Sequence, residues 1–439
     1  MGVRKLNKFL TTREITKSYR NIQEFINKLR IEKNNSHNGK IVIAIDFWLY
    51  AHKFLHSNRS ENILLGFWNQ VLKFFLCGIV PLYVMDGSVP IEKQEKVDER
   101  TKKRNNCKKK IDDIDNEIEK YININDLVDK QSDDRQTDDR HSDDRQTDDR
   151  QSDDRQSDDR QPLWSDGKQS DGRQPVWSDG RQPLWLDHSD CCTDSNDSND
   201  ATNHTDDDNL DAMYKKKEKL QKQIKRIKTS ELYNIHKLLD VLGVPYVKAE
   251  FEADAMCAKL FKEKIITTCL SDDMDMLALG CGSTIKFHDG KLIEFNMDQI
   301  KENLEFNQEQ FIDMCIMFGC DYLQHPFRFE CEDVYKMIKK HGSLLDALCS
   351  NEHELFNMNN SNVKVIGEQY YQVKETYLSS YEREHIPKNL LDIKMQQINF
   401  DDLLYFLKKL KWFDVSPKNI KIIEESIEKI NTMIEHDEL

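Results

Sequence analysis

The chain has 439 residues, of which 38% are hydrophobic and 33% charged, and its formal net charge is −15. It is long enough for one large domain or two ordinary ones, and no apolar stretch approaches the ~20 residues of a membrane span. The eleven cysteines include no CxxC pair and no signal peptide is recognisable, so we expect buried free thiols in a reducing compartment rather than a zinc site.

The first 110 residues contain two short runs of β-branched and aromatic residues, at 40–45 (KIVIAI) and 79–85 (IVPLYVM). Runs of this length and composition are predicted to be strands. Residues 61–78 (ENILLGFWNQVLKFFLCG) lie between them and have the periodicity of a helix. We therefore assign residues 1–110 to the N-terminal half of a folded core.

Residues 111–213 interrupt this alternation as a variable insertion. Its segment 131–210 begins with six tandem pentads of the type Gln-Ser/Thr-Asp-Asp-Arg and lacks core-forming periodicity, so we expect it to be disordered. The segment holds 23 Asp and 9 Lys or Arg, a net charge of −14 that leaves −1 for the rest of the chain. The acidic balance therefore does not argue against a nucleic-acid partner. We interpret the repeat as a tolerated insertion, with a DNA mimic or a docking tail as the alternatives.

Basic sequence flanks the insertion at 96–110 (KVDERTKKRNNCKKK) and 214–228 (YKKKEKLQKQIKRIK). Both segments are predicted to be helices. Their charge fits either solvated helix faces or contact with phosphates.

Alternating elements resume after the insertion. Helical periodicity covers 229–243 and 251–264, a strand is predicted at 265–270 (IITTCL), and 283–295 is predicted to be a hairpin turned at Asp289-Gly290. Short apolar strands separated by helices predict an α/β fold, with a mainly parallel sheet covered by helices on both faces. Residues 214–345 form the second half of the core, and 346–439 a C-terminal helical region.

Acidic residues follow three of the predicted strands. Asp46 and Asp86 come directly after the first two, and the run Asp272 to Asp275 follows the third. Ligands of open α/β sheets bind beyond the carboxyl ends of the strands, so we expect these acids to share one edge. Glu252 and Asp254 open the helix at 251–264. A single acid here could simply cap a turn, but so many carboxylates together require a cation.

An oxygen-only ligand set with no His or Cys suits Mg²⁺ or Mn²⁺ better than zinc. Two such ions can hydrolyse a phosphodiester by generating a hydroxide and stabilising the leaving oxygen. A phosphatase forming an aspartyl-phosphate and a calcium-binding loop both fit the spacing around Asp273 poorly.

Several motifs resemble, in order, those of the flap endonuclease/XPG family of structure-specific 5′ nucleases. They are MGVRKL, VIAIDFWLYAHK, PLYVMDGSVP, LGVPYVKAEFEADAMCAKL, LSDDMDML and FIDMCIMFGCDYL. The resemblance covers about residues 1–110 and 214–345. It implies a PIN-like fold with a basic helical arch at the segments that flank the insertion.

The resemblance also implies roles for individual residues. Lys93 and Arg100 match the basic pair that reaches the scissile phosphate, and Asp272 falls outside the ligand set as a neighbour. The implied ligands of two Mg²⁺ (or Mn²⁺) are Asp46, Asp86, Glu252, Asp254, Asp273, Asp275 and Asp321. The implied DNA-binding residues are Gly2, His52, Lys102, Lys103 and Arg104.

The sequence departs from the family pattern in two places. The stretch LQHPFRFECEDVYKMIKKHG lacks the Gly-x-Gly hairpin that grips duplex phosphates, often with K⁺. The C-terminal region lacks a sliding-clamp-binding motif.

The expected function is that of a Mg²⁺-dependent nuclease acting on branched, flap or 5′-ended DNA in replication, repair or recombination. The alternative is a catalytically inactive nucleic-acid-binding scaffold of the same fold. Flap, exonuclease and bubble-cutting activities are not separated by the sequence. We expect a monomer without membrane association, located in the nucleus, or in a host nucleus if the source is a virus.

Overall fold

The computed structural model describes residues 3, 5–33, 40–57, 62–136, 206–323, 330–350, 360–410, 413–437 and 439. These residues divide into two compact units. The first comprises the described residues up to Asn105 and from Ile224 onward, and the second comprises those from Asn106 to Gln223.

The first unit is built on a seven-stranded sheet with the strand order β1-β7-β6-β5-β2-β3-β4. Neighbouring strands from β6 to β4 are parallel, whereas β7 pairs antiparallel with both β6 and β1. The strands are β1 Lys17–Tyr19, β2 Ile41–Asp46, β3 Ile79–Met85, β4 Tyr246–Lys248, β5 Thr268–Leu270, β6 Ser283–His288 and β7 Lys291–Asn296.

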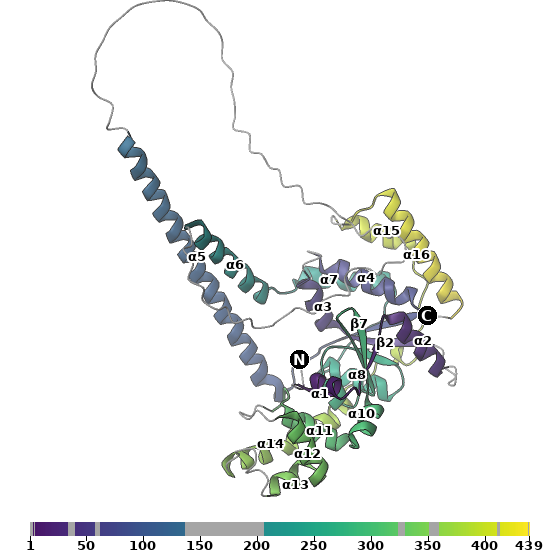
Figure 1. Ribbon diagram of the computed structural model, residues 1–439. Coiled ribbons are helices and arrows are strands. Elements are labelled where there is room, and N and C mark those ends of the chain that lie inside the picture. Colours follow the sequence, from purple (N-terminus) through teal and green to yellow (C-terminus); the bar gives the residue numbers. More distant parts are fainter. Residues whose placement is uncertain are drawn as a thin grey trace, which may run out of the picture. The chain divides into compact units, whose positions relative to one another are not determined.

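Helices cover both faces of this sheet (Figure 1). Right-handed crossovers put the helices that lead from β2 to β4 on one face and those that lead from β4 to β6 on the other. The helices of the first face are α3 Phe47–Leu55, α4 Ile63–Leu76 and α7 Thr229–Val241, joined by α15 Phe400–Lys409 and α16 Pro417–Glu435. Those of the second face are α8 Ala253–Lys262 and α9 Asp275–Ala278, joined by α11 Gln308–Phe318, α12 Cys331–His341, α13 Leu344–Cys349 and α14 Asn360–Ser379.

Three further helices complete the unit. They are α1 Leu6–Thr12, α2 Ile22–Lys33 and α10 Met297–Leu304. Among the described residues, no helix combines the length and the apolar character that a bilayer crossing requires.

The central strands are buried along their whole length. Every residue of β3 is buried, as are the first five residues of β2, which explains their continuous apolar sequence. Pro81 is tolerated inside β3 because β4 begins only opposite Tyr83, so no ladder bond to β4 is lost at the proline. The buried polar pair Gln70 and Tyr83 is satisfied by a hydrogen bond of 2.7 Å from the Tyr83 hydroxyl.

The order in which strands are added to the sheet reverses between the neighbouring parallel strands β2 and β5. From β2 the chain proceeds to β3 and β4 on one side, and from β5 to β6 on the other. Such a switch point opens a crevice at the carboxyl ends of the strands. Asp46 ends β2 and Ser271 follows β5, so both lie at this crevice.

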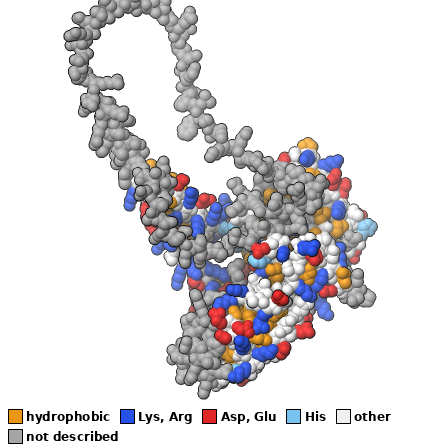
Figure 2. All heavy atoms as spheres, in the orientation of Figure 1, with side chains coloured by type: hydrophobic (Ala, Val, Ile, Leu, Met, Phe, Trp, Pro, Cys, Tyr) orange, Lys and Arg blue, Asp and Glu red, His pale blue; other side chains and the backbone are white. Residues whose placement is uncertain are grey.

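The second unit is a pair of antiparallel helices. It consists of α5 Gln94–Gln136 from Asn106 onward and α6 Asp206–Ile224. The thiol of Cys107 contacts the side-chain oxygen of Gln223 at 3.5 Å, and Lys217 forms an ion pair with Asp115. Among the side chains of this unit that the structure describes, the buried apolar ones are Ile111, Ile114 and Ile118. Figure 2 shows that Lys and Arg side chains gather on the described part of the pair, interspersed with acids.

The predicted α/β fold with a mainly parallel sheet is confirmed, as are the strands at β2 and β3 and the hairpin turned at Asp289 and Gly290. The strand predicted at 265–270 is shorter than expected and begins at Thr268. Lys264 adopts a φ of 58° and turns the chain out of α8, so Ile265 and Ile266 belong to the connection. The predicted second basic helix ends at Ile224 rather than at 228. Residues 137–205, which hold most of the acidic repeat, lie outside the described part.

Candidate metal-dependent nuclease site

Asp46 joins the two sides of the crevice. It caps α3 by accepting the Leu49 N–H at 3.1 Å, as an aspartate at a helix start commonly does. Its second carboxylate oxygen accepts the Ser271 hydroxyl at 3.3 Å, across the switch point. The N–H of Asp273 donates to the same Ser271 oxygen at 3.0 Å. Ser271 therefore fixes the acid that ends β2 relative to the acids that follow β5.

Asp86 connects the end of β3 to the beginning of α8. Its carboxylate accepts the N–H of Ala253 at 2.9 Å. Glu252 is the N-cap residue of α8, and Asp254 lies in the first turn. This bond and the favourable position of acids at a helix N-terminus bring all three carboxylates to one edge.

The segment that carries Glu252 is held from both sides. The N–H groups of Gly87 and Ser88 donate to the carbonyl oxygens of Phe251 and Glu250 at 2.8 and 2.9 Å. On the other side, the buried carboxylate of Glu384 accepts the N–H groups of Glu250, Phe251 and Glu252 at 2.7, 3.1 and 3.2 Å.

The acids after β5 form a tight turn. The Asp273 carboxylate accepts the N–H of Asp275 at 3.0 Å. Asp275 is fully buried, and one of its oxygens accepts the Tyr377 hydroxyl at 3.0 Å. Its other oxygen is buried without a hydrogen-bond partner. Asp272 forms an ion pair with Lys53 at 2.6 Å, which separates its role from that of Asp273.

Basic residues reach the same edge from the start of the long helix. Lys93, in a single 3₁₀ turn (η1, Ile91–Lys93), pairs with Glu252 at 2.6 Å, and its ammonium lies 4.6 Å from the ring centre of Tyr322. The Tyr322 hydroxyl donates to the other oxygen of Glu252 at 2.6 Å. Arg100, on α5, pairs with Asp321 at 3.2 Å.

The carboxylates destabilise one another's ionised forms. Burial, together with the charges of Asp86 and Asp273 and against the effect of the Leu49 hydrogen bond, raises the pKa of Asp46 to about 7. Burial together with Asp273 raises the pKa of Asp275 to about 8. Burial followed by the charges of Asp273 and Asp46 raises the pKa of Asp254 well above its ordinary value. These mutual effects identify a single acidic cluster.

Two further acids belong to this cluster. Desolvation raises the pKa of Asp86, although part of its side chain is exposed, and the charge of Glu252 adds to the shift. Burial also raises the pKa of Asp273, and Asp321 contributes in the same direction.

The side chains fit a hard divalent cation in their chemistry. All seven are oxygen donors, and Asp275 presents a buried oxygen that no protein group satisfies. Among the described residues, however, no three His, Cys, Asp or Glu side chains stand ready to hold a metal. Lys93 and Arg100 neutralise Glu252 and Asp321 in this arrangement, which offsets part of the repulsion.

The remaining predicted DNA-binding residues are dispersed. His52 is exposed on α3 and its ring stacks on His56. Lys102 and Lys103 are exposed on α5, Arg104 is half-buried, and Lys103 pairs with Glu99 at 2.7 Å. Gly2 lies outside the described residues.

Several supporting residues of the site were not predicted from the sequence. Ser271 and Tyr322 adjoin predicted ligands, so their neighbours in the chain could have indicated them. Tyr377 and Glu384 lie in the C-terminal helical region and carry no local motif.

A mainly parallel sheet with acids at its switch point and basic side chains beside them defines a PIN-like fold of the 5′ nuclease type. Residues 1–107 match the XPG N-terminal domain, and residues 243–321 match the XPG I-region. In these two regions, the chain is similar to the XPG family.

Relatives and solved structures agree with this similarity. Flap endonuclease 1 of Trypanosoma brucei gambiense is 28% identical over 190 residues, covering 42% of this chain and 46% of the relative. Flap endonuclease 1 of Yarrowia lipolytica is 39% identical over 114 residues, covering 25% and 29% respectively. The matched region thus spans less than half the length of these relatives.

The fold is similar to two solved structures. One is the catalytic core of Rad2 in complex with DNA substrate, with a TM-score of 0.54, 14% identity, and coverage of 98% of this chain and 100% of that one. The other is human GEN1 in complex with Holliday junction DNA, with a TM-score of 0.54, 14% identity, and coverage of 99% and 79%. At this identity the similarity establishes the fold alone.

Proposed function

We propose that this protein is a Mg²⁺-dependent, structure-specific 5′ nuclease that hydrolyses DNA phosphodiesters in replication, repair or recombination. The observation that carries the proposal is the gathering of seven acids at the switch point, each of them electrostatically or ionically linked to another member or to a basic residue of the site. The matches to the two XPG domains and the fold support the same proposal.

The acids are proposed to hold two Mg²⁺ ions, with Mn²⁺ as a substitute. When bound, the ions would supply a hydroxide nucleophile and stabilise the leaving oxygen. The protein's own contribution is to keep Asp46, Asp273 and the α8 carboxylates in fixed positions through Ser271, Asp86 and Glu384. No histidine is required as a general base.

Lys93 and Arg100 are proposed to contact the scissile phosphate. Burial would lower the pKa of Lys93, but Tyr322, Glu252 and Asp275 outweigh it and hold that pKa well above its ordinary value. A permanent ammonium beside the acids suits the stabilisation of developing negative charge. In the substrate-free protein this ammonium binds Glu252 instead.

The basic residues at 102–104 are proposed to bind the phosphate backbone. Lys102 and Lys103 point their charges into solvent from α5, where contact with phosphates would release counterions. Binding should therefore weaken steeply with salt. The proposed DNA partner is branched, flap or 5′-ended, the proposed state is a monomer, and the proposed location is the nucleus.

The test is cleavage of end-labelled flap, nicked, bubble and single-stranded DNA by the full chain in Mg²⁺. We expect Asp86→Ala and Asp273→Ala to abolish cutting while DNA binding persists. Asp272→Ala is the matched control, because this neighbour pairs with Lys53 and should retain cutting. Retained cutting by either of the first two variants would contradict the metal assignment. Binding without cutting by the unmodified protein would favour the inactive scaffold.

A further inference from the structure

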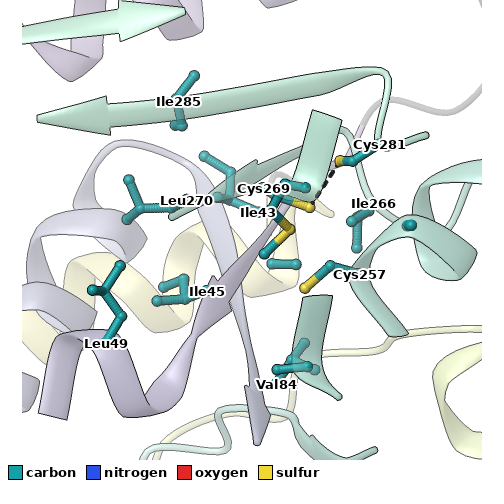
Figure 3. Packing of buried hydrophobic residues seen from close by; sticks show 14 of the residues in the cluster. Ile43, Ile45, Leu49, Val84, Cys257, Ile266, Cys269, Leu270, Cys281 and Ile285 are labelled. Atoms are coloured by element: carbon teal, nitrogen blue, oxygen red, sulfur yellow. Dashed lines mark hydrogen bonds between the residues drawn. The ribbon is translucent and has the colours of Figure 1, made fainter. Parts of the chain in front are cut away.

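Three cysteines gather in the hydrophobic core (Figure 3). They are Cys257 on α8, Cys269 on β5 and Cys281 in the turn between α9 and β6, and all three are fully buried. The sulfur atoms of Cys269 and Cys281 share a hydrogen bond at 3.2 Å. The Cys257 thiol also shares a hydrogen bond with Cys269.

The position of this pair in the chain is informative. Cys269 lies four residues before Asp273, and Cys281 lies six residues after Asp275. A bond between the two sulfur atoms would therefore close a ring of thirteen residues around both acids. The short distance between the two sulfur atoms favours oxidation as the chemistry of this pair.

We propose that Cys269 and Cys281 form a reversible disulfide site that responds to a hydroperoxide. One thiolate attacks the peroxide oxygen, which yields a sulfenic acid and releases the other oxygen as water after protonation. The second thiol then attacks the sulfenic sulfur and displaces its hydroxide. This hydroxide takes up the thiol proton and leaves as a second water. Two thiols and one hydrogen peroxide thus become one disulfide and two waters, and an added dithiol reverses the oxidation.

The two sulfur atoms already lie close to each other. The sulfur atoms must approach by about 1 Å to reach a disulfide length of about 2.05 Å. Cys281 lies between Gly280, at φ 89°, and Gly282, both half-buried, so the residues beside it present no side chains to the solvent. Opening of this turn would admit a small peroxide.

Cys281 is the thiol expected to react first. The hydrogen bond with Cys269 lowers the pKa of Cys281, whereas burial raises the pKa of Cys269 well above its ordinary value. The sulfur of Cys281 also lies 3.3 Å from the Ser283 carbonyl oxygen. Cys269 is then the resolving thiol.

The effect on cutting rests on the proposed nuclease function. Drawing Cys281 toward β5 strains the segment that carries Asp273 and Asp275. Misplacement of a catalytic group by about 1 Å can slow a reaction by about 100-fold. We therefore expect the oxidised protein to cut DNA between about 10-fold and 100-fold more slowly, and dithiothreitol to restore the rate.

The site itself is tested without activity. The reduced full chain is treated with hydrogen peroxide, denatured, alkylated and digested with a protease that cuts before the aspartates between the two cysteines. Mass spectrometry should find a dithiothreitol-sensitive link between the peptides of Cys269 and Cys281. The link should vanish in Cys269→Ala and in Cys281→Ala, and persist in Cys320→Ala, the control for another buried thiol.

Each outcome decides the proposal. If both cysteines remain alkylatable while the exposed Cys349 is oxidised, the site does not exist. A link from Cys257 to Cys269 would overturn the assigned pair. Circular dichroism of each alanine variant verifies folding. Because the crosslink is scored by mass, its absence is distinguishable from a protein that never cuts DNA. Crosslinking with unchanged cutting would overturn the coupling to the acidic segment.

Discussion

The carboxylate of Glu384 accepts the backbone N–H of Glu252 at 3.2 Å, although the two residues are 132 positions apart. The same carboxylate accepts the two preceding N–H groups, of Glu250 and Phe251. The N–H groups at the start of α8, which have no partner within the helix, thus donate to a residue of the C-terminal helical region. This contact fixes the position from which Glu252 and Asp254 project.

Glu384→Ala should destabilise the protein, because three backbone N–H groups lose their acceptor. We expect the free energy of unfolding in urea to fall by about 3 kcal/mol, and cutting to fall further than DNA binding at a temperature where the variant is folded. Glu384→Gln keeps one acceptor oxygen and should recover part of both losses. The control is Glu382→Gln, an exposed neighbour. Equal stability and equal cutting of Glu382→Gln and Glu384→Ala would contradict the proposed role of Glu384 in holding the start of α8.

Lys93→Met should slow cutting by about 100-fold with little change in DNA affinity, because one fixed charge beside the reacting phosphate is removed. Single-turnover cleavage and a binding titration separate the two quantities. Lys421→Met serves as the control, since this exposed lysine pairs with Glu425 on α16 and its removal should change cutting little. A larger loss of cutting for Lys421→Met than for Lys93→Met would contradict the proposed contact.

Mg²⁺ should raise the melting temperature of the protein, because a bound cation relieves the repulsion among buried carboxylates. Thermal unfolding is followed at several Mg²⁺ concentrations without DNA. In Asp275→Asn the increase should be smaller, while the matched Asp272→Asn variant should respond like the unmodified protein. Identical increases in all three proteins would place the ions elsewhere.

The stability of the metal-free protein should depend more steeply on pH than that of the Asp275→Asn variant. The folded protein holds the Asp275 proton up to pH about 8, whereas the unfolded chain releases it near the ordinary value of 3.8. Stability from this group therefore falls as pH rises between these values, by at most about 1.4 kcal/mol per pH unit. Urea unfolding is measured at pH 5 and pH 8. The free energy of unfolding of the variant, relative to that of the unmodified protein, should be higher at pH 8 than at pH 5. A constant difference would mean that this carboxyl is not perturbed.

Gly87→Ala should destabilise the loop after β3, because the added Cβ would lie 2.1 Å from the carbonyl oxygen of Ala249 and 2.3 Å from that of Glu250. We expect a loss of about 2 kcal/mol in urea unfolding, together with loss of cutting. Val89→Ala changes an exposed side chain in the same loop and is the control. Full stability of Gly87→Ala would show that the close approach is not required.

The sequence by itself determined the strands, their closing acids and the similarity to the XPG family. Asp46, Asp86 and Asp273 follow short apolar runs, and these runs are local features that need no distant partner. Parallel pairing then brings the ends of the strands to one edge. The acids of the cluster were therefore predictable from the linear order of residues.

Only the tertiary structure decided what holds and neutralises these acids. Tyr377 and Glu384 reach the site from more than a hundred residues away, the ammonium of Lys93 binds Glu252, and Cys269 meets Cys281 in the hydrophobic core. None of these contacts has a signature in the sequence, because each depends on how helices and strands pack side by side. Packing geometry depends on the whole fold. A strand followed by an aspartate, in contrast, can be recognised from a few consecutive residues.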